Sequence, residues 1–183
     1  MATLIKNRQI APDSWQLLEP SPEGGVPGTP LTGDWIVPLA VWNEQREQLI
    51  GHANERSGRN GVLLENTDDP RALGADFDRL ALIAVRFPKF TDGRGYSIAR
   101  LLRRLGWKGE LRADGDVLRD QLFYMTRCGF DSFKLRADQD AQVALTAFND
   151  FTAPYQPAID DGVRFGANPQ RVADAPVHAH SPW

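Results

Sequence analysis

Cysteine, histidine and long apolar runs are scarce in this sequence of 183 residues, and each shortage excludes a class of protein. The single cysteine, Cys128, has no internal partner for a disulfide, and it cannot supply the thiolates of an iron–sulfur cluster. The histidines are only His52, His178 and His180, so no histidine-based metal centre is expected. No stretch approaches the roughly 18 apolar residues that a membrane-spanning helix needs. We therefore expect no contact with a membrane.

The composition is that of a globular domain with a core of its own. Hydrophobic residues make up 42% of the chain, too large a share for a disordered protein. Residues 1–10 include Lys6 and Arg8 but no apolar run behind them, so we expect no secretion signal. These features together predict a cytoplasmic location.

The net charge of −3 hides an uneven distribution. Residues 86–136 contain twelve basic and six acidic side chains, whereas the rest of the chain contains nine basic and eighteen acidic ones. The basic middle suits an anion or an acidic partner. Nucleic acid is not expected, because the pI of about 5.6 lies well below the value above about 9 that is typical of nucleic-acid-binding domains.

Proline and glycine mark the ends of the folded part. Residues 20–33 hold four prolines and four glycines, a density that sustains neither a helix nor a central strand. We therefore predict an N-terminal arm and linker over residues 1–33, in which residues 3–18 form a small ribbon or arm. A single α/β domain should follow over residues 34–152. The tail, 153–183, is again rich in proline, glycine and aspartate and is expected to be irregular.

Inside that domain, a short apolar run alternates five times with a segment of helical periodicity. The expected strands are 35–41, 61–64, 80–86, 110–113 and 130–135, and the expected helices are 43–56, 70–77, 95–105, 117–128 and 138–151. This alternation predicts an α/β fold of about five strand–helix units, with a mostly parallel sheet and right-handed crossovers. Periodicity leaves open whether the sheet is open and doubly wound or an incomplete barrel.

The first candidate site is the loop at residues 87–97, which joins the third expected strand to the third expected helix. Parallel sheets bind ligands at the carboxyl ends of their strands. The chemistry-bearing residues of the loop are Lys89, Asp92, Gly93, Arg94, Gly95 and Ser97. The glycines would let backbone amides approach a bound group, and the cations and the helix N-terminus would attract an anion, so the loop predicts an oxyanion cradle. Alternatively, Asp92 caps the helix, the glycines make a turn and Arg94 is solvated.

The second candidate site is the next loop along the chain, at residues 112–121. Asp116 precedes a helical run and Asp114 lies near the end of a strand, so this pair is a candidate for general acid and base, with Lys89 as a third catalytic candidate. A metal is not expected, because the only further carboxylate at hand is Asp92. The alternative is that these acids cap the helix and form an ion pair with Arg94 or Arg119. Arg112 and Arg119 would add positive charge to either site.

Two residue types near these loops have a more ordinary interpretation. Cys128 ends an apolar helix and lacks a neighbouring histidine, so we expect it to pack in the core. Trp35 and Trp42 flank an expected strand and should also be core residues. Trp107 follows a helix-ending glycine and is predicted to contact a partner.

Three segments carry a resemblance to a known family. They are FPKFTDGRGYS at residues 87–97, GELRADGDVLRDQ at 109–121 and RCGFD at 127–131. Together they closely resemble the bacterial family called domain of unknown function 934, and the similarity extends over about residues 35–151. Members of that family are often labelled as oxidoreductases and tend to be encoded beside a sirohaem sulfite reductase. The resemblance therefore implies a role in assimilatory sulfate and sulfite reduction.

The residues themselves do not supply redox chemistry, since the sequence has no flavin or nicotinamide fingerprint and no dithiol. We therefore expect no cofactor and favour an accessory protein that binds sulfite reductase, or an oxyanion such as sulfite or a phosphosulfate nucleotide, through the basic glycine loop. An enzyme acting on an anionic small molecule by acid–base chemistry is the second hypothesis. A structural homodimer built on residues 87–135 is the third.

Overall fold

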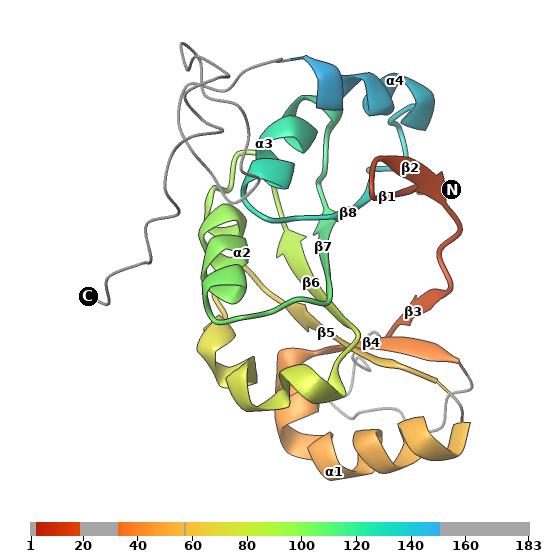
Figure 1. The fold of residues 1–183 in the computed structure, drawn as a ribbon, viewed down its shortest axis with the longest axis vertical. Helices are drawn as coiled ribbons and strands as arrows, with labels where there is room; N and C mark the ends of the chain where they lie inside the picture. The colour runs from red at the N-terminus through yellow and green to blue at the C-terminus, as the bar shows by residue number, and fades with distance from the viewer. Residues whose placement is uncertain (1–2, 19–32, 57, 151–183) are drawn as a thin grey trace, which may run out of the picture.

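The computed structural model describes residues 3–18, 33–56 and 58–150 (Figure 1). The linker up to residue 32 and the tail at 153–183, which includes His178 and His180, lie outside the described residues. The side chain of His52 lies outside them as well.

The described strands form one eight-stranded sheet in the order β2-β1-β8-β7-β6-β5-β4-β3. The strands are β1 (Leu4–Lys6), β2 (Gln9–Ala11), β3 (Trp15–Leu17), β4 (Asp34–Pro38), β5 (Asn60–Leu64), β6 (Leu82–Phe87), β7 (Glu110–Gly115) and β8 (Ser132–Lys134). Strands β3 to β8 run parallel to one another, and β1 is antiparallel to both β2 and β8. The mostly parallel sheet therefore confirms the α/β fold that the alternating pattern predicted.

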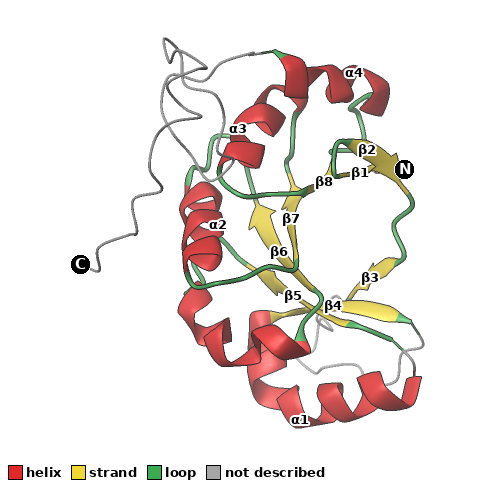
Figure 2. Ribbon diagram, viewed as in Figure 1, coloured by secondary structure: helices red, strands yellow, loops and turns green. Residues whose placement is uncertain are grey.

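The sheet is curled into an incomplete barrel, with the helices along its outer side (Figure 2). Strands β4 to β8 are neighbours in chain order, and right-handed crossovers between sequential parallel strands place every connecting helix on the same face. The helical segments are α1 (Leu39–Arg56), η1 (Pro70–Arg79), α2 (Arg94–Arg104), η2 (Arg119–Gln121), α3 (Leu122–Arg127), α4 (Ala141–Leu145) and η3 (Thr146–Asn149), where η denotes a 3₁₀ helix. The doubly wound alternative does not fit this sequential order.

The core is divided by the sheet into two parts. The larger part lies between the sheet and the helices, and includes Trp42, Phe87 and Phe133. A smaller apolar cluster lies on the concave face near the β3 edge and includes Trp15 and Leu82. No helix within the described ranges is both long and apolar enough to cross a membrane.

Several element boundaries differ from the expected ones. Residues 3–18 are not a separate ribbon, because β1 and β2 extend the sheet at one edge and β3 extends it at the other. Helix α1 begins at Leu39, directly after Pro38, so Trp42 lies in a helix and not beside a strand. Helix α3 begins only at Leu122, because Leu118 is extended. The segment after β5 is a 3₁₀ helix, whose first residue, Pro70, has the fixed φ that a helix start favours.

Candidate functional site

The candidate functional site is the carboxyl edge of the sheet. Strands β5 to β8 are parallel, so the loops that follow them meet at the same edge. The loop at residues 88–93, called the β6–α2 loop, joins β6 to α2. It belongs to the segment that the sequence singled out.

The base of the β6–α2 loop is held by Asp116 from the β7 side. Oδ2 of Asp116 accepts a hydrogen bond from the Phe90 backbone N–H at 2.8 Å, and Oδ1 accepts one from Nη1 of Arg136 at 2.7 Å. The backbone N–H of Asp116 donates to the Phe87 carbonyl at 2.8 Å. Both carboxylate oxygens are therefore occupied, and Asp116 braces the loop.

Gln121 completes this brace from η2. Its Nε2 donates to the Phe90 carbonyl at 2.7 Å and to the Tyr96 hydroxyl at 3.2 Å. Within the loop, the backbone N–H of Asp92 donates to the Lys89 carbonyl at 3.0 Å and closes a tight turn. Both backbone polar groups of Phe90 are thus bound by side chains, which fixes the loop in one conformation.

Asp92 holds the junction of the loop and α2. Its carboxylate accepts hydrogen bonds from the Arg94 backbone N–H at 3.0 Å, from the Arg94 guanidinium at 2.6 and 3.0 Å, and from Nδ2 of Asn66 at 2.5 Å. The hydrogen bonds from the Arg94 side chain lower the pKa of Asp92 far below its usual value, and those from the Arg94 backbone and Asn66 add to the effect. The anion at this helix N-terminus is therefore the chain's own carboxylate. The capping alternative is only partly met, because the N-cap residue is Gly93 and Arg94 is paired with Asp92 and not simply solvated.

The two glycines of the hallmark have different surroundings. A Cβ added to Gly95 would lie 2.5 Å from Cζ of Phe87, so this glycine lets α2 pack directly against a buried aromatic ring. Gly93 has open space around its Cα and a φ of −81°, which any residue adopts. Ser97 is exposed on α2, and its hydroxyl makes no hydrogen bond with a described residue.

The tip of the loop has few contacts. Lys89 is exposed, and its side-chain ammonium forms no ion pair or hydrogen bond with the residues that the structure describes. The side chain of Phe90 is large and apolar, yet the residue is 50% exposed. A lysine and a phenylalanine thus project side by side from a braced loop.

Asp114 lies on the concave side of the same edge. Its Oδ2 is 2.8 Å from Nη1 of Arg86, and its Oδ1 is 3.9 Å from Nζ of Lys134. Asp114 is buried, and each of its carboxylate oxygens lies near a cation. Asp114 and Asp116 therefore have separate partners. In the described ranges, no group of three or more His, Cys, Asp or Glu residues is arranged to hold a metal ion.

Arg112 and Arg119 bind partners away from the loop. Arg112 points to the concave face, where it pairs with Glu110 and Asp13. Nη2 of Arg119 is 2.8 Å from Oδ1 of Asp150 and 3.0 Å from the hydroxyl of Thr146. The structure therefore does not bring these two arginines into contact with the glycine loop.

Two of the more ordinary interpretations have opposite outcomes. Cys128 is fully buried as expected, and burial raises the pKa of its thiol despite the nearby Arg100. Trp107 is buried, packs against Phe77 and donates its Nε1–H to the Glu110 carbonyl, so the expectation that it contacts a partner is wrong. Gly109 permits this arrangement, because a Cβ there would clash with the folded-back indole ring.

The sequence analysis missed four residues that shape the site: Asn66, Phe90, Gln121 and Arg136. Asn66 lies two residues after the end of β5, so applying the strand-end rule to every loop would have found it. Gln121 and Phe90 belong to the hallmark segments and were passed over because they carry no charge. Arg136 gave no signal for the site, since Asp116 lies twenty residues earlier in the chain.

Comparison with known proteins agrees with the resemblance carried by the hallmark segments. The family model described as "Bacterial protein of unknown function (DUF934)" matches residues 61–165, which is more than half of the chain. The match includes the β6–α2 loop, Asp116 and Gln121. No curated protein matches the chain. The chain therefore belongs to the DUF934 family of bacterial proteins of unknown function.

Proposed function

We propose that this protein is an accessory protein of assimilatory sulfite reduction, which docks on sirohaem sulfite reductase through Lys89 and Phe90. The observation that carries the docking proposal is the contrast within the β6–α2 loop. Its backbone is braced by Asp116 and Gln121, whereas its two tip side chains face solvent. The identity of the partner rests on the family resemblance, because members tend to be encoded beside that enzyme.

A braced loop with an exposed aromatic tip has the energetics of a docking element. Binding costs less conformational entropy when the loop is already fixed, and burying a phenylalanine side chain that was exposed contributes up to about 1.5–3 kcal/mol. Aromatic anchors beside a cation are typical of residues that dominate interface energies. The excess of basic residues over 86–136 favours an acidic partner and faster encounter with it.

The contacts of the loop support docking over a free oxyanion. The guanidinium of Arg94 is occupied by Asp92, and the same carboxylate stands at the N-terminus of α2. An oxyanion there would have to displace the Asp92 carboxylate from Arg94, or bind with Lys89 as the one unpaired cation among the described residues of the loop. The acid–base enzyme is also less well supported, because both oxygens of Asp116 are bound and Asp114 is held between two cations.

The test measures the affinity of purified sirohaem sulfite reductase from the same bacterium for the wild-type protein and for variants of the tip. We expect Phe90→Ala and Lys89→Ala each to raise Kd by about tenfold, which corresponds to about 1.4 kcal/mol. Ile10→Ala is the matched control. Ile10 is exposed to a similar extent as Phe90, at 41%, but it lies on β2, which is an edge strand of the sheet. Its Kd should equal that of the wild type.

Two results would overturn the proposal. One is the absence of binding by the wild-type protein at micromolar concentrations, and the other is an equal effect of Phe90→Ala and Ile10→Ala.

Arg94→Ala separates docking from the oxyanion alternative. An anion cradle predicts that this variant loses sulfite binding directly, whereas docking predicts only a modest effect through Asp92.

A further inference from the structure

The N-terminal segment crosses the concave face of the sheet. Strand β2 lies at one edge of the sheet and β3 lies at the other, so residues 11–15 must pass from edge to edge (Figure 1). Every helix lies on the opposite face. The chain's own N-terminal segment, residues 11–15, is therefore the cover over this part of the concave face, and it is called the strap.

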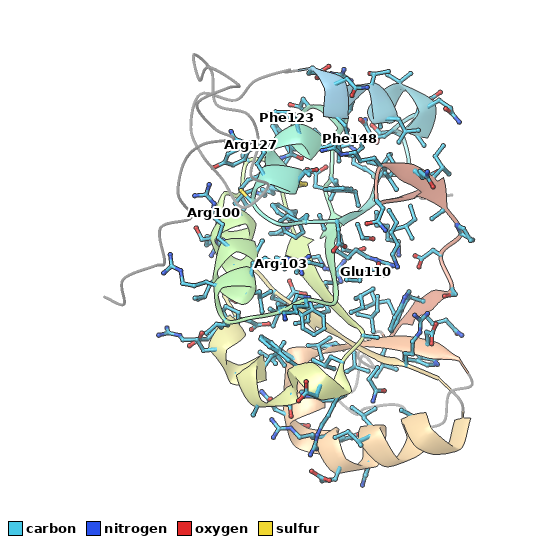
Figure 3. The ribbon with its side chains drawn as sticks, viewed as in Figure 1. Arg100, Arg103, Glu110, Phe123, Arg127 and Phe148 are labelled. Atoms are coloured by element: carbon cyan, nitrogen blue, oxygen red, sulfur yellow. The ribbon has the colours of Figure 1, made fainter. Side chains whose placement is uncertain are left out.

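Beneath the strap lies a row of polar side chains from three adjacent strands. Arg112 of β7 is the register partner of Ser132 of β8, and Ser132 is the register partner of Lys6 of β1. Residues in register on neighbouring strands point to the same face. Glu110 lies two residues before Arg112 on β7, so its side chain points to the same face and belongs to the same polar row. Figure 3 shows Glu110 on the side of β7 that faces the strap.

Within this row, Glu110 binds two of the three nitrogen atoms of the Arg112 guanidinium. The third, Nη1, needs an acceptor that does not come from these three strands. Glu110 accepts from Nε and Nη2 of Arg112 at 3.1 and 2.8 Å, and from Nζ of Lys6 at 2.6 Å. Burial acts to raise the pKa of Glu110, but the hydrogen bond from Lys6 and the charge of Arg112 hold it below its usual value. Two cations thus share one carboxylate, and the sheet carries a surplus positive charge.

Asp13 of the strap supplies the missing negative charge. Its Oδ1 accepts from Nη1 of Arg112 at 2.9 Å and from the Trp15 backbone N–H at 3.2 Å. The side chain of Arg112 is only 1% exposed, whereas that of Asp13 is 21% exposed. A buried guanidinium needs a counter-charge, and here that charge comes from the solvent-facing side of the cluster.

Ser132 adds an unused group to the same place. The residue is fully buried, and its hydroxyl makes no hydrogen bond of ordinary geometry with any described residue, although it lies near enough to Glu110 to help lower that pKa. Buried hydroxyls are nearly always hydrogen-bonded in folded proteins, so a hydroxyl without a partner of ordinary geometry beside two cations can still donate to a further acceptor.

We propose that Asp13 occupies the position of a ligand, and that the concave face holds an anion site which opens when the strap lifts. The ligand is a small anion with a carboxylate or tetrahedral oxyanion group, bound by Nη1 of Arg112 with the help of Lys6 and the hydroxyl of Ser132. Exchange of Asp13 for a singly charged ligand leaves the charge of the cluster unchanged. This site is distinct from the β6–α2 loop and does not rest on the proposed docking function.

The middle of the strap, residues 12–14, is attached to the sheet by few contacts. Strands β2 and β3 are three residues long and lie at the edges of the sheet, so each pairs with one neighbour. Between them, the side-chain contacts to the sheet among the described residues are Asp13 with Arg112 and the Ser14 hydroxyl with Asp34 at 3.2 Å. Local opening of residues 12–14 has to break these two contacts, while Trp15 at the end of the strap stays buried in the concave apolar cluster.

The test compares the full-length wild-type protein with Asp13→Asn by calorimetric titration with sodium sulfate and, separately, sodium acetate at constant ionic strength. If the closed form holds about nine-tenths of the molecules, removal of the internal carboxylate lowers the apparent Kd by about tenfold. The control is Asp69→Asn, because Asp69 also accepts a backbone N–H two residues on, here that of Arg71, and carries the same charge. Tighter sulfate than acetate binding would identify a tetrahedral oxyanion site, and the reverse a carboxylate site.

Two further measurements locate the site and guard against misfolding. Amide chemical shifts of Ser132 and Arg112 should move on titration of Asp13→Asn, and Lys6→Gln in the same background should reverse the gain in affinity. Lys6 is partly exposed, so this variant should keep the fold. Equal affinities of Asp13→Asn, Asp69→Asn and the wild type for both anions, with native-like spectra, would overturn the proposal.

Discussion

Substitution of Gly95 by alanine is the sharpest test of how α2 meets the sheet. The added Cβ would lie within 2.5 to 3.0 Å of three atoms of the Phe87 ring, closer than real Cβ contacts allow. Phe87 is itself buried and packs against Tyr96 and Phe130, so its ring has little freedom to move away. The helix or the ring must shift to relieve the overlap.

The expected magnitude follows from two opposing effects. Overpacking of this kind costs about 1–3 kcal/mol, whereas replacing a helical glycine with alanine contributes about 0.5–1 kcal/mol in favour of folding. The net loss in the free energy of unfolding is therefore about 0–2.5 kcal/mol, centred at about 1 kcal/mol. For a chain of this length, that lowers Tm by up to about 10 °C.

Gly93→Ala is the matched control, because it changes the neighbouring glycine of the same motif in open space. It should leave the free energy of unfolding unchanged or raise it by about 0.4–1 kcal/mol. Urea unfolding followed by fluorescence measures both variants. Equal stability of Gly95→Ala and Gly93→Ala would refute the packing argument, and it would favour the alternative in which both glycines serve the approach of a ligand.

Three further predictions concern other parts of the structure. Asp116→Ala removes the acceptor for the Phe90 N–H and for Arg136; it should lower the free energy of unfolding by about 1–2 kcal/mol and speed hydrogen exchange at residue 90. The pKa of Glu110 is held below its usual value in the folded state. The ionised carboxylate therefore contributes to stability above the unfolded pKa of about 4.3, and this contribution is lost as the pH falls through the folded pKa. Glu110→Gln should flatten the acid limb of a plot of Tm against pH. Cys128 should react with a thiol reagent only after unfolding, because its thiol is buried and its pKa is raised; rapid reaction in the native state would contradict this.

The alternating pattern was sufficient to predict the fold class because the parallel strands have local sequence signatures. The incomplete barrel could also have been inferred from β7, in which Glu110, Arg112 and Asp114 alternate with Leu111 and Ala113. A strand covered by helices on both faces is apolar throughout, so this alternation indicates that one face has no helical cover. The interpretation of these residues as members of loop sites hid that signal.

The N-terminal strands could not be predicted in the same way. Each has three residues, and the contacts that hold them are remote in sequence, as in the ion pair of Lys6 with Glu110.

In the β6–α2 loop, the sequence identified the segment but not the pairing of its charges. Arg94 and Asp92 are close neighbours in the chain, and only the structure determines that they bind each other and leave Lys89 exposed.

Hydrogen exchange of the unmodified protein, measured with and without sirohaem sulfite reductase, tests the docking proposal most directly. The account predicts slower exchange in the complex at residues 89–92 and at the start of α2, with no change at Gln9 to Ala11 of β2. Protection that is absent at the β6–α2 loop, or confined to β2 and the strap, would contradict the proposal that Lys89 and Phe90 form the docking surface.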